Sequence, residues 1–200
     1  MREIEGTYFD PAEDGFTPVT PGIYPAHVIA FDMKDSGRNG EPFANNSKVF
    51  NLTFKIADEA SKIEVDKIAL NGNGTYTTVT DGNGKTVKIK ATNAVGKKYN
   101  SQGVWLTPKT GKDEGWKNRN YNKFFTALGI EFPDKDGKLK LAQVEEGDVI
   151  GRPALVRLAE EKYMNNEGEE KTSMKVFDAY DWAEGRRISQ DELDEADLPF

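Results

Sequence analysis

Apolar and polar residues alternate most regularly in KVFNLTFKIAD, residues 48–58. Apolar side chains occupy every second position from Phe50 to Ile56, and polar side chains fill the positions between them. A period of two is expected of a strand that has one buried face. An earlier stretch, GIYPAHVIAFDMKD at residues 22–35, is rich in residues that favour β-structure and predicts another strand.

Two longer stretches have the pattern of β-hairpins. TYTTVTDGNGKTVKIK, residues 75–90, places the turn residues DGNG between flanks rich in Thr and Val. PALVRLAEEKYMNNEGEEKTSMKVFDAYDW, residues 153–182, has NNEGEE as its turn. Each stretch therefore predicts two antiparallel strands joined by a short connection.

One helix is predicted between these two hairpin-like groups, in NRNYNKFFTALGI. Its apolar residues recur at i, i+3, i+4 and i+7, at Tyr121, Phe124, Phe125 and Leu128. Gly129 follows directly, where a helix is expected to end.

Five or six strands with one helix predict a mainly β fold, an OB-type Greek-key barrel in which the helix joins the third and fourth strands. A split α+β sheet is the alternative. The chain has 200 residues, which suits one domain with extensions. We expect an irregular N-terminal arm at residues 1–20, an OB-like domain at residues 21–182 and an acidic C-terminal tail at residues 183–200.

Charge is distributed unevenly, although the net charge is only −7. Residues 85–125 contain ten Lys and Arg against two acids, whereas residues 178–200 contain eight acids against two Arg. A basic middle and an acidic end in one chain indicate a polyanionic partner and an electrostatic competitor for it.

Composition also restricts the cellular compartment and the kinds of catalytic or metal site that the chain can form. The chain has no Cys, which excludes disulfides and thiolate metal sites and fits a reducing compartment. No stretch reaches the roughly 20 apolar residues of a membrane span, and MREIEGTYFD lacks the apolar core of a signal peptide. His27 is the only His, so a catalytic triad or a multi-His metal site cannot form. We therefore expect a cytoplasmic protein without cofactor or metal.

Two stretches match known enzyme motifs only weakly. Gly84-Lys85-Thr86 ends like a phosphate-binding loop, but the position five residues earlier is Val79 rather than Gly. Asp134 with EEK at residues 160–162 loosely matches a metal-dependent nuclease pattern, in which carboxylates hold Mg²⁺ beside an activated water. In a chain with 34 acids such a match arises easily by chance, and the nuclease stays an alternative.

Aromatic residues interleave with the bases of the middle segment. Bases neutralise phosphates, while exposed rings stack on unpaired nucleobases. Trp116 stands in KDEGWKNRN, which is polar, contains Gly and predicts a loop, and Tyr99 follows two lysines, so both are expected to be exposed. Trp105 precedes Leu106 and fits a core or a groove equally, and Phe43 is a weaker candidate. The predicted DNA-binding residues are Lys88, Lys90, Lys97, Lys98, Tyr99, Trp105, Lys109, Lys112, Trp116, Lys117 and Arg119.

The last residues, DEADLPF, resemble the C-terminal tip of bacterial single-stranded DNA-binding proteins, an acidic run closed by a short apolar motif ending in Pro-Phe. Phage replication proteins of this class end similarly. The resemblance covers about ten residues. Leu198 stands where the bacterial tip has Ile, and the linker before the tip is short. The rest of the chain resembles phage single-stranded DNA-binding proteins only in its general order of strands and one helix.

The resemblance implies a phage-encoded protein that binds single-stranded DNA in replication or recombination, with a tail that recruits partner proteins. The ring of Phe200 would enter a partner's pocket, and the acidic side chains would compete with DNA for the basic side chains of the protein. No apolar periodicity ties residues 191–200 to the core, so we expect their removal to leave the fold intact. A strand-annealing or host-factor-binding protein is a further alternative. The tail residues are Asp191, Glu192, Asp194, Glu195, Asp197, Leu198, Pro199 and Phe200.

Overall fold

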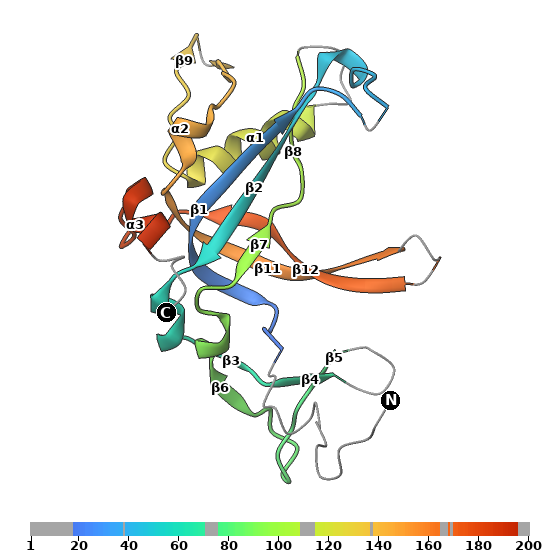
Figure 1. Ribbon diagram of the computed structural model, residues 1–200, viewed down its shortest axis with the longest axis vertical. Coiled ribbons are helices and arrows are strands. Elements are labelled where there is room, and N and C mark those ends of the chain that lie inside the picture. Colours follow the sequence, from blue (N-terminus) through green and yellow to red (C-terminus); the bar gives the residue numbers. More distant parts are fainter. Residues whose placement is uncertain are drawn as a thin grey trace, which may run out of the picture.

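The computed structural model describes residues 18–37, 39–70, 76–108, 115–136, 138–164, 168 and 170–195 (Figure 1). The predictions for most of the N-terminal arm, for Lys109 and Lys112 and for the last five residues lie outside this part of the chain.

The described residues are mainly β, as the sequence predicts, and none of their helices is long and apolar enough to cross a membrane. The elements in chain order are β1 (Gly22–Lys34), η1 (Ala44–Asn46), β2 (Lys48–Ile56), η2 (Asp58–Lys62), β3 (Glu64–Asp66), β4 (Ile68–Leu70), β5 (Tyr76–Thr78), β6 (Lys88–Lys90), η3 (Ala91–Ala94), β7 (Lys98–Asn100), β8 (Val104–Leu106), α1 (Gly115–Ala127), β9 (Asp134–Lys135), β10 (Lys138–Leu139), α2 (Glu146–Val149), β11 (Pro153–Met164), β12 (Glu170–Tyr180) and α3 (Gln190–Glu195).

The main sheet is antiparallel and follows the order β12-β11-β1-β2-β7, with β8 pairing farther along β2. Its two edges approach each other at a single parallel bridge between Ser101 and Val176, where the amide of Gln102 donates to the Val176 carbonyl at 2.9 Å. Within the described strands the ladder goes no further, so the antiparallel sheet is not closed. The predicted 153–182 hairpin is confirmed as β11 and β12, which project as a long arm (Figure 1).

Helix α1 packs against the inner face of the sheet through aromatic rings. Phe50 of β2 is fully buried, and its ring centroid lies 5.2 Å from that of Tyr121 and 5.8 Å from that of Phe125. The Tyr121 hydroxyl donates to the Ala142 carbonyl at 2.9 Å and accepts the Val144 amide at 3.0 Å. Burial raises the pKa of Tyr121 to about 12, so the phenol stays protonated and keeps both hydrogen bonds. The predicted helix and its apolar stripe are confirmed.

The described residues between 57 and 97 form a small lobe at the end of the main sheet opposite α1 (Figure 1). The predicted turn at DGNG is present, since the Gly84 amide donates to the Asp81 carbonyl at 3.0 Å. The predicted pairing of its flanks is present only next to the turn, where Thr80 bridges Thr86 and the Val87 amide donates to the Val79 carbonyl at 3.0 Å. Farther from the turn the prediction is wrong, because β5 pairs with β4 and β6 with β3. The backbone of Lys67 explains the difference: it accepts from Val79 and donates to Val87, both at 2.8 Å. The preceding segment thus inserts between the two flanks.

The beginning of the acidic tail packs on the domain. Leu193 of α3 is only 5% exposed, and the Ile188 amide donates to the Gly151 carbonyl at 2.9 Å. Arg186 holds the Glu192 carboxylate at 2.6 Å, and this pairing lowers the pKa of Glu192 to about 2. Packing therefore continues past residue 183. The premise that nothing ties residues 191–200 to the core is wrong, because Leu193 is buried. We therefore expect removal of residues 191–200 to destabilise the protein.

Gly151 fixes the position of this docked segment. Its φ is +76°, and a Cβ there would lie 1.9 Å from the Ile188 carbonyl oxygen. We expect Gly151→Ala to destabilise the protein by about 1–3 kcal/mol through backbone strain alone, with a further loss from displacing residue 188. Gly147→Ala is the control, since nothing lies within 4 Å of its Cβ. Urea unfolding of both variants checks this, and equal stabilities would contradict the role of Gly151.

Candidate nucleic-acid interface

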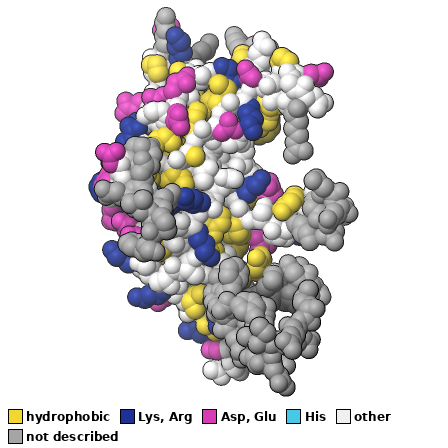
Figure 2. Space-filling view, viewed as in Figure 1, with side chains coloured by type: hydrophobic (Ala, Val, Ile, Leu, Met, Phe, Trp, Pro, Cys, Tyr) yellow, Lys and Arg dark blue, Asp and Glu magenta, His cyan; other side chains and the backbone are white. Residues whose placement is uncertain are grey.

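An open cleft of about 410 Å³ lies between the outer edges of β8 and β12, against α1. It occupies the place where the described ladder stops after the bridge between Ser101 and Val176. The molecule is hollowed between the part that carries α1 and β8 and the projecting β11–β12 arm, and apolar side chains mix with Lys and Arg on this face (Figure 2). The incomplete closure of the sheet therefore produces the cleft.

Three side chains at the rim of the cleft, together with Phe43 behind one of them, form what we call the tryptophan cluster: Phe43, Trp105, Trp116 and Lys117. The Phe43 ring meets Trp105 edge-on, with 5.0 Å between centroids. The Lys117 ammonium lies 5.6 Å from the Trp105 ring centroid and 6.0 Å from that of Trp116. A cation held between two indole faces is an arrangement that can present a charge and stacking surfaces to one ligand.

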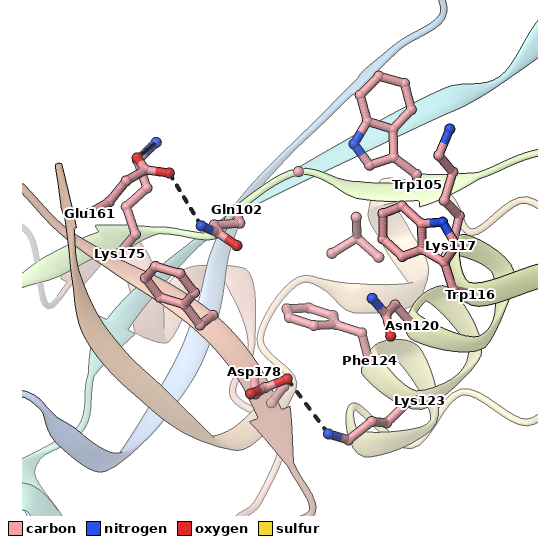
Figure 3. A pocket seen from close by; sticks show the side chains of 14 residues that line it. Gln102, Trp105, Trp116, Lys117, Asn120, Lys123, Phe124, Glu161, Lys175 and Asp178 are labelled. Atoms are coloured by element: carbon pink, nitrogen blue, oxygen red, sulfur yellow. Dashed lines mark hydrogen bonds and ion pairs between the residues drawn. The ribbon is translucent and has the colours of Figure 1, made fainter. Parts of the chain in front are cut away.

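Trp116 is exposed, as predicted, with 55% of its surface accessible. The predicted loop around it is wrong, because Trp116 lies in the first turn of α1. Trp116, Asn120 and Lys123 are spaced i, i+4 and i+7, which places them on one helix face, and all three line the cleft (Figure 3). The buried stripe of α1 begins only at Tyr121, which is why the sequence around Trp116 resembled a loop.

The opposite wall of the cleft is formed by β11 and β12. Gln102 donates to the Glu161 carboxylate at 3.2 Å, and Lys175 pairs with the same carboxylate at 2.5 Å (Figure 3). The hydrogen bond from Lys175 is the main cause that lowers the pKa of Glu161, followed in the same direction by Gln102. On the floor, Lys123 lies 3.6 Å from Asp178.

Phe177 is a lining residue that the sequence analysis missed. Arg157 pairs with Asp178 and Leu158 with Val176, so Phe177 is an additional, unpaired residue in β12. Such a bulge turns a side chain away from the regular alternation. A signal existed in the sequence, because the inward residues Val176 and Ala179 are three apart rather than two.

Two of the predicted lysines face acids in the small lobe. Lys88 forms an ion pair with Asp66, and Lys90 stands opposite Glu64 in the β3–β6 pairing. Both lysines are exposed, but they lie in the lobe formed by residues 57–97 and not with the tryptophan cluster (Figure 1). Part of the positive charge counted along the sequence is therefore offset in the fold.

The residues predicted on β7 are also separated from the cluster. Lys98 is exposed and Lys97 half-buried, whereas the ring of Tyr99 packs against the core and its burial raises its pKa to about 12. Lys98 pairs with Lys55 of β2, whereas Trp105 of β8 pairs with Val49, six residues earlier on the same strand. At about 3.3 Å per residue this separation is roughly 20 Å. Tyr99 is thus not the exposed stacking residue that its neighbours suggested.

The structure therefore divides the predicted DNA-binding set. Trp105, Trp116 and Lys117 come together at the cleft, and Arg119 is exposed on the same helix, α1. Lys123 belongs to the basic segment 85–125 and also lines the cleft, although it is not among the predicted DNA-binding residues.

The residues of the nuclease pattern lie in different parts of the fold. Asp134 is in β9, while Glu161 and Lys162 are in the outer half of β11 (Figure 1). Glu161 is paired with Lys175, and Lys162 with Glu170 at 2.7 Å. In the part of the chain that the structure describes, no three His, Cys, Asp or Glu side chains are grouped as metal ligands.

No protein-family profile matches this chain, and no curated protein is significantly similar to it in sequence. We therefore infer a function from the cleft and from the chemistry of its side chains.

Trp116 offers a direct test of the cluster. Because its ring is exposed, we expect Trp116→Ala to change the free energy of unfolding by no more than about 0.5 kcal/mol while it weakens binding of a labelled dT oligonucleotide by about 1–3 kcal/mol. Fluorescence anisotropy measures the affinity. Ile23→Ala removes a similarly exposed apolar side chain on β1 and should leave the affinity unchanged. A loss of stability without a loss of affinity would contradict the stacking role.

Proposed function

We propose that the protein binds single-stranded DNA without sequence specificity, with the tryptophan cluster as the main contact. The observation that carries this proposal is the position of Lys117 between the rings of Trp105 and Trp116 at the mouth of an open cleft. An ammonium group pairs with a backbone phosphate, and the indole faces stack on neighbouring bases. This combination is typical of single-strand binding.

The chemistry favours a single strand over a duplex. Bases in a duplex already stack on one another and cannot offer their faces to Trp116, whereas unpaired bases can. Stacking tolerates every base because each has a π-face, so the cluster by itself would not select a sequence. Lys117, Arg119 and Lys123 on α1 would track the phosphates on either side of the stacked bases.

We also propose that the domain is an OB-type barrel with an incomplete wall. The strand order β12-β11-β1-β2-β7 supports this, since it matches a five-strand barrel in which β7 and β8 together act as the third strand. Helix α1 lies between the third and fourth of these strands along the chain, as the sequence pattern predicts. The parallel bridge from Ser101 to Val176 would be the remnant of barrel closure.

The acidic tail would compete with the DNA phosphates for Lys and Arg side chains of the protein. Its last residues would recruit partner proteins in replication or recombination. In support, Glu192 and Leu193 of α3 line a second, smaller cleft together with Lys55. The acidic run therefore begins beside a lysine of β2. We propose that this activity serves a phage in the cytoplasm of its host.

Salt dependence tests the electrostatic part of the proposal. If four to six phosphates are neutralised, the logarithm of affinity should fall against the logarithm of salt concentration with a slope of about −3 to −4, or about −0.7 per contact. Lys117→Gln should reduce the magnitude of that slope by about 0.7. Lys88→Gln is the matched control, because Lys88 is already paired with Asp66 and lies in the small lobe.

Affinity that does not respond to salt, or an equal effect of Lys88→Gln and Lys117→Gln, would contradict binding at the cluster. A wild-type protein that binds duplex as tightly as a single strand would contradict the proposed function itself.

Neutralising four tail acids tests the competition without disturbing the docked segment. The changes are Asp191→Asn, Asp194→Asn, Glu195→Gln and Asp197→Asn, which spare Leu193 and the Arg186–Glu192 pair. We expect tighter binding of single strands at low salt, with a gain that shrinks near 0.1 M, where the Debye length is about 10 Å. Titrations at several salt concentrations measure it. Weaker DNA binding by the folded variant would contradict competition.

A further inference from the structure

We propose that the cleft beneath the tryptophan cluster is a subsite for one unstacked nucleobase, with Phe177 as its stacking surface. This inference rests on the proposed function, and it assigns a second role to the site. The cluster would hold the strand at the rim, while one base would turn inward between α1 and β12.

The bulge in β12 presents the Phe177 ring to the cleft. The guanidinium carbon of Arg157 lies 5.4 Å from the centroid of that ring, and Phe177 remains half-buried as part of the cleft lining. The bulge leaves Phe177 without a partner on β11 while Val176 and Ala179 stay buried in the core. The ring is therefore supported by a cation and offers an apolar surface to a ligand.

Polar groups around this ring suit the edge of a base. Asn120 is exposed on α1 and lines the cleft, and its side-chain amide makes no hydrogen bond within the described part of the chain. An amide carries both donors and an acceptor, so it can pair with the edge of any base. Gln102 already donates to Glu161 and keeps its carbonyl oxygen as an acceptor.

The charges of the cleft fit an anionic strand. Its two carboxylates, Glu161 and Asp178, are each paired with a cleft lysine, at 2.5 and 3.6 Å. Arg157 also holds Asp178 at 2.8 Å, and Lys117 stands at the rim. The volume of about 410 Å³ lies near the lower end of the roughly 300–1,000 Å³ typical of small-ligand sites, which favours one base over several.

An abasic-site scan distinguishes this subsite from the cluster. The probe is the shortest dT oligonucleotide that binds the full chain with undiminished affinity, so that it cannot slide, and a single abasic site is moved through it. At one position the missing base should weaken binding roughly 5- to 150-fold, the range expected for one stacked base.

Phe177→Ala should cause a similar loss with the intact oligonucleotide, and the same abasic site should then have no additional effect. This non-additivity is the signature of a direct contact. Trp116→Ala should instead remove the penalty at a different position. Phe177→Leu keeps an apolar side chain without a ring and should behave like Phe177→Ala. If neither Phe177 variant folds by circular dichroism, Asn120→Ala on the exposed helix face replaces them in the same cycle.

The subsite would be overturned if the loss from the abasic site and the loss from the Phe177 or Asn120 variant simply added at every position of the oligonucleotide. In that outcome the wild-type protein would still bind the intact strand. Absence of binding to the intact strand would instead overturn the proposed function. A cleft that accepts a peptide or a free small molecule would give the additive result, because no base of the oligonucleotide would reach Phe177.

Discussion

The contact of Phe50 with Tyr121 and Phe125 is the interaction on which the rest of the structure depends. It fixes α1 across the inner face of β2. Phe50 is also the residue of β2 that pairs with Val104 of β8. The first turn of α1 is thereby held beside β8, where Trp116 reaches the neighbourhood of Trp105. The position of the tryptophan cluster is thus a consequence of how a buried aromatic cluster orients one helix.

Incomplete pairing of the sheet gives the protein its cleft. Among the described residues, the two outer strand edges of the sheet are bridged only at Ser101 and Val176. The bulge at Phe177 adds a residue to β12 just beyond that point. Unpaired edges and bulges cost some ladder hydrogen bonds, but they leave space and aim side chains where a ligand can bind. Ion pairs of Lys175 with Glu161 and of Lys123 with Asp178 define the walls of that space.

Charge along the chain and charge in space differ in this protein. Lys88 belongs to the most basic segment, yet the fold places it against Asp66. The acidic tail is also less free than its composition indicates, since Leu193 is buried and Glu192 is held by Arg186. The charge pattern along the chain suggested the polyanionic partner that we propose, whereas cross-strand neighbours determine which lysines stand opposite an acid.

The sequence by itself determined the local elements whose periodicity is strong. It predicted β2, α1 and its buried stripe, the β11–β12 hairpin and the exposure of Trp116, because burial of one face imposes a period that is visible in the residues. Only the tertiary structure decided the partners of β5 and β6, the inward position of Tyr99, the place of Phe177 and the docking of Leu193. Those features depend on contacts between residues far apart in the chain, and a local pattern of polarity does not encode them.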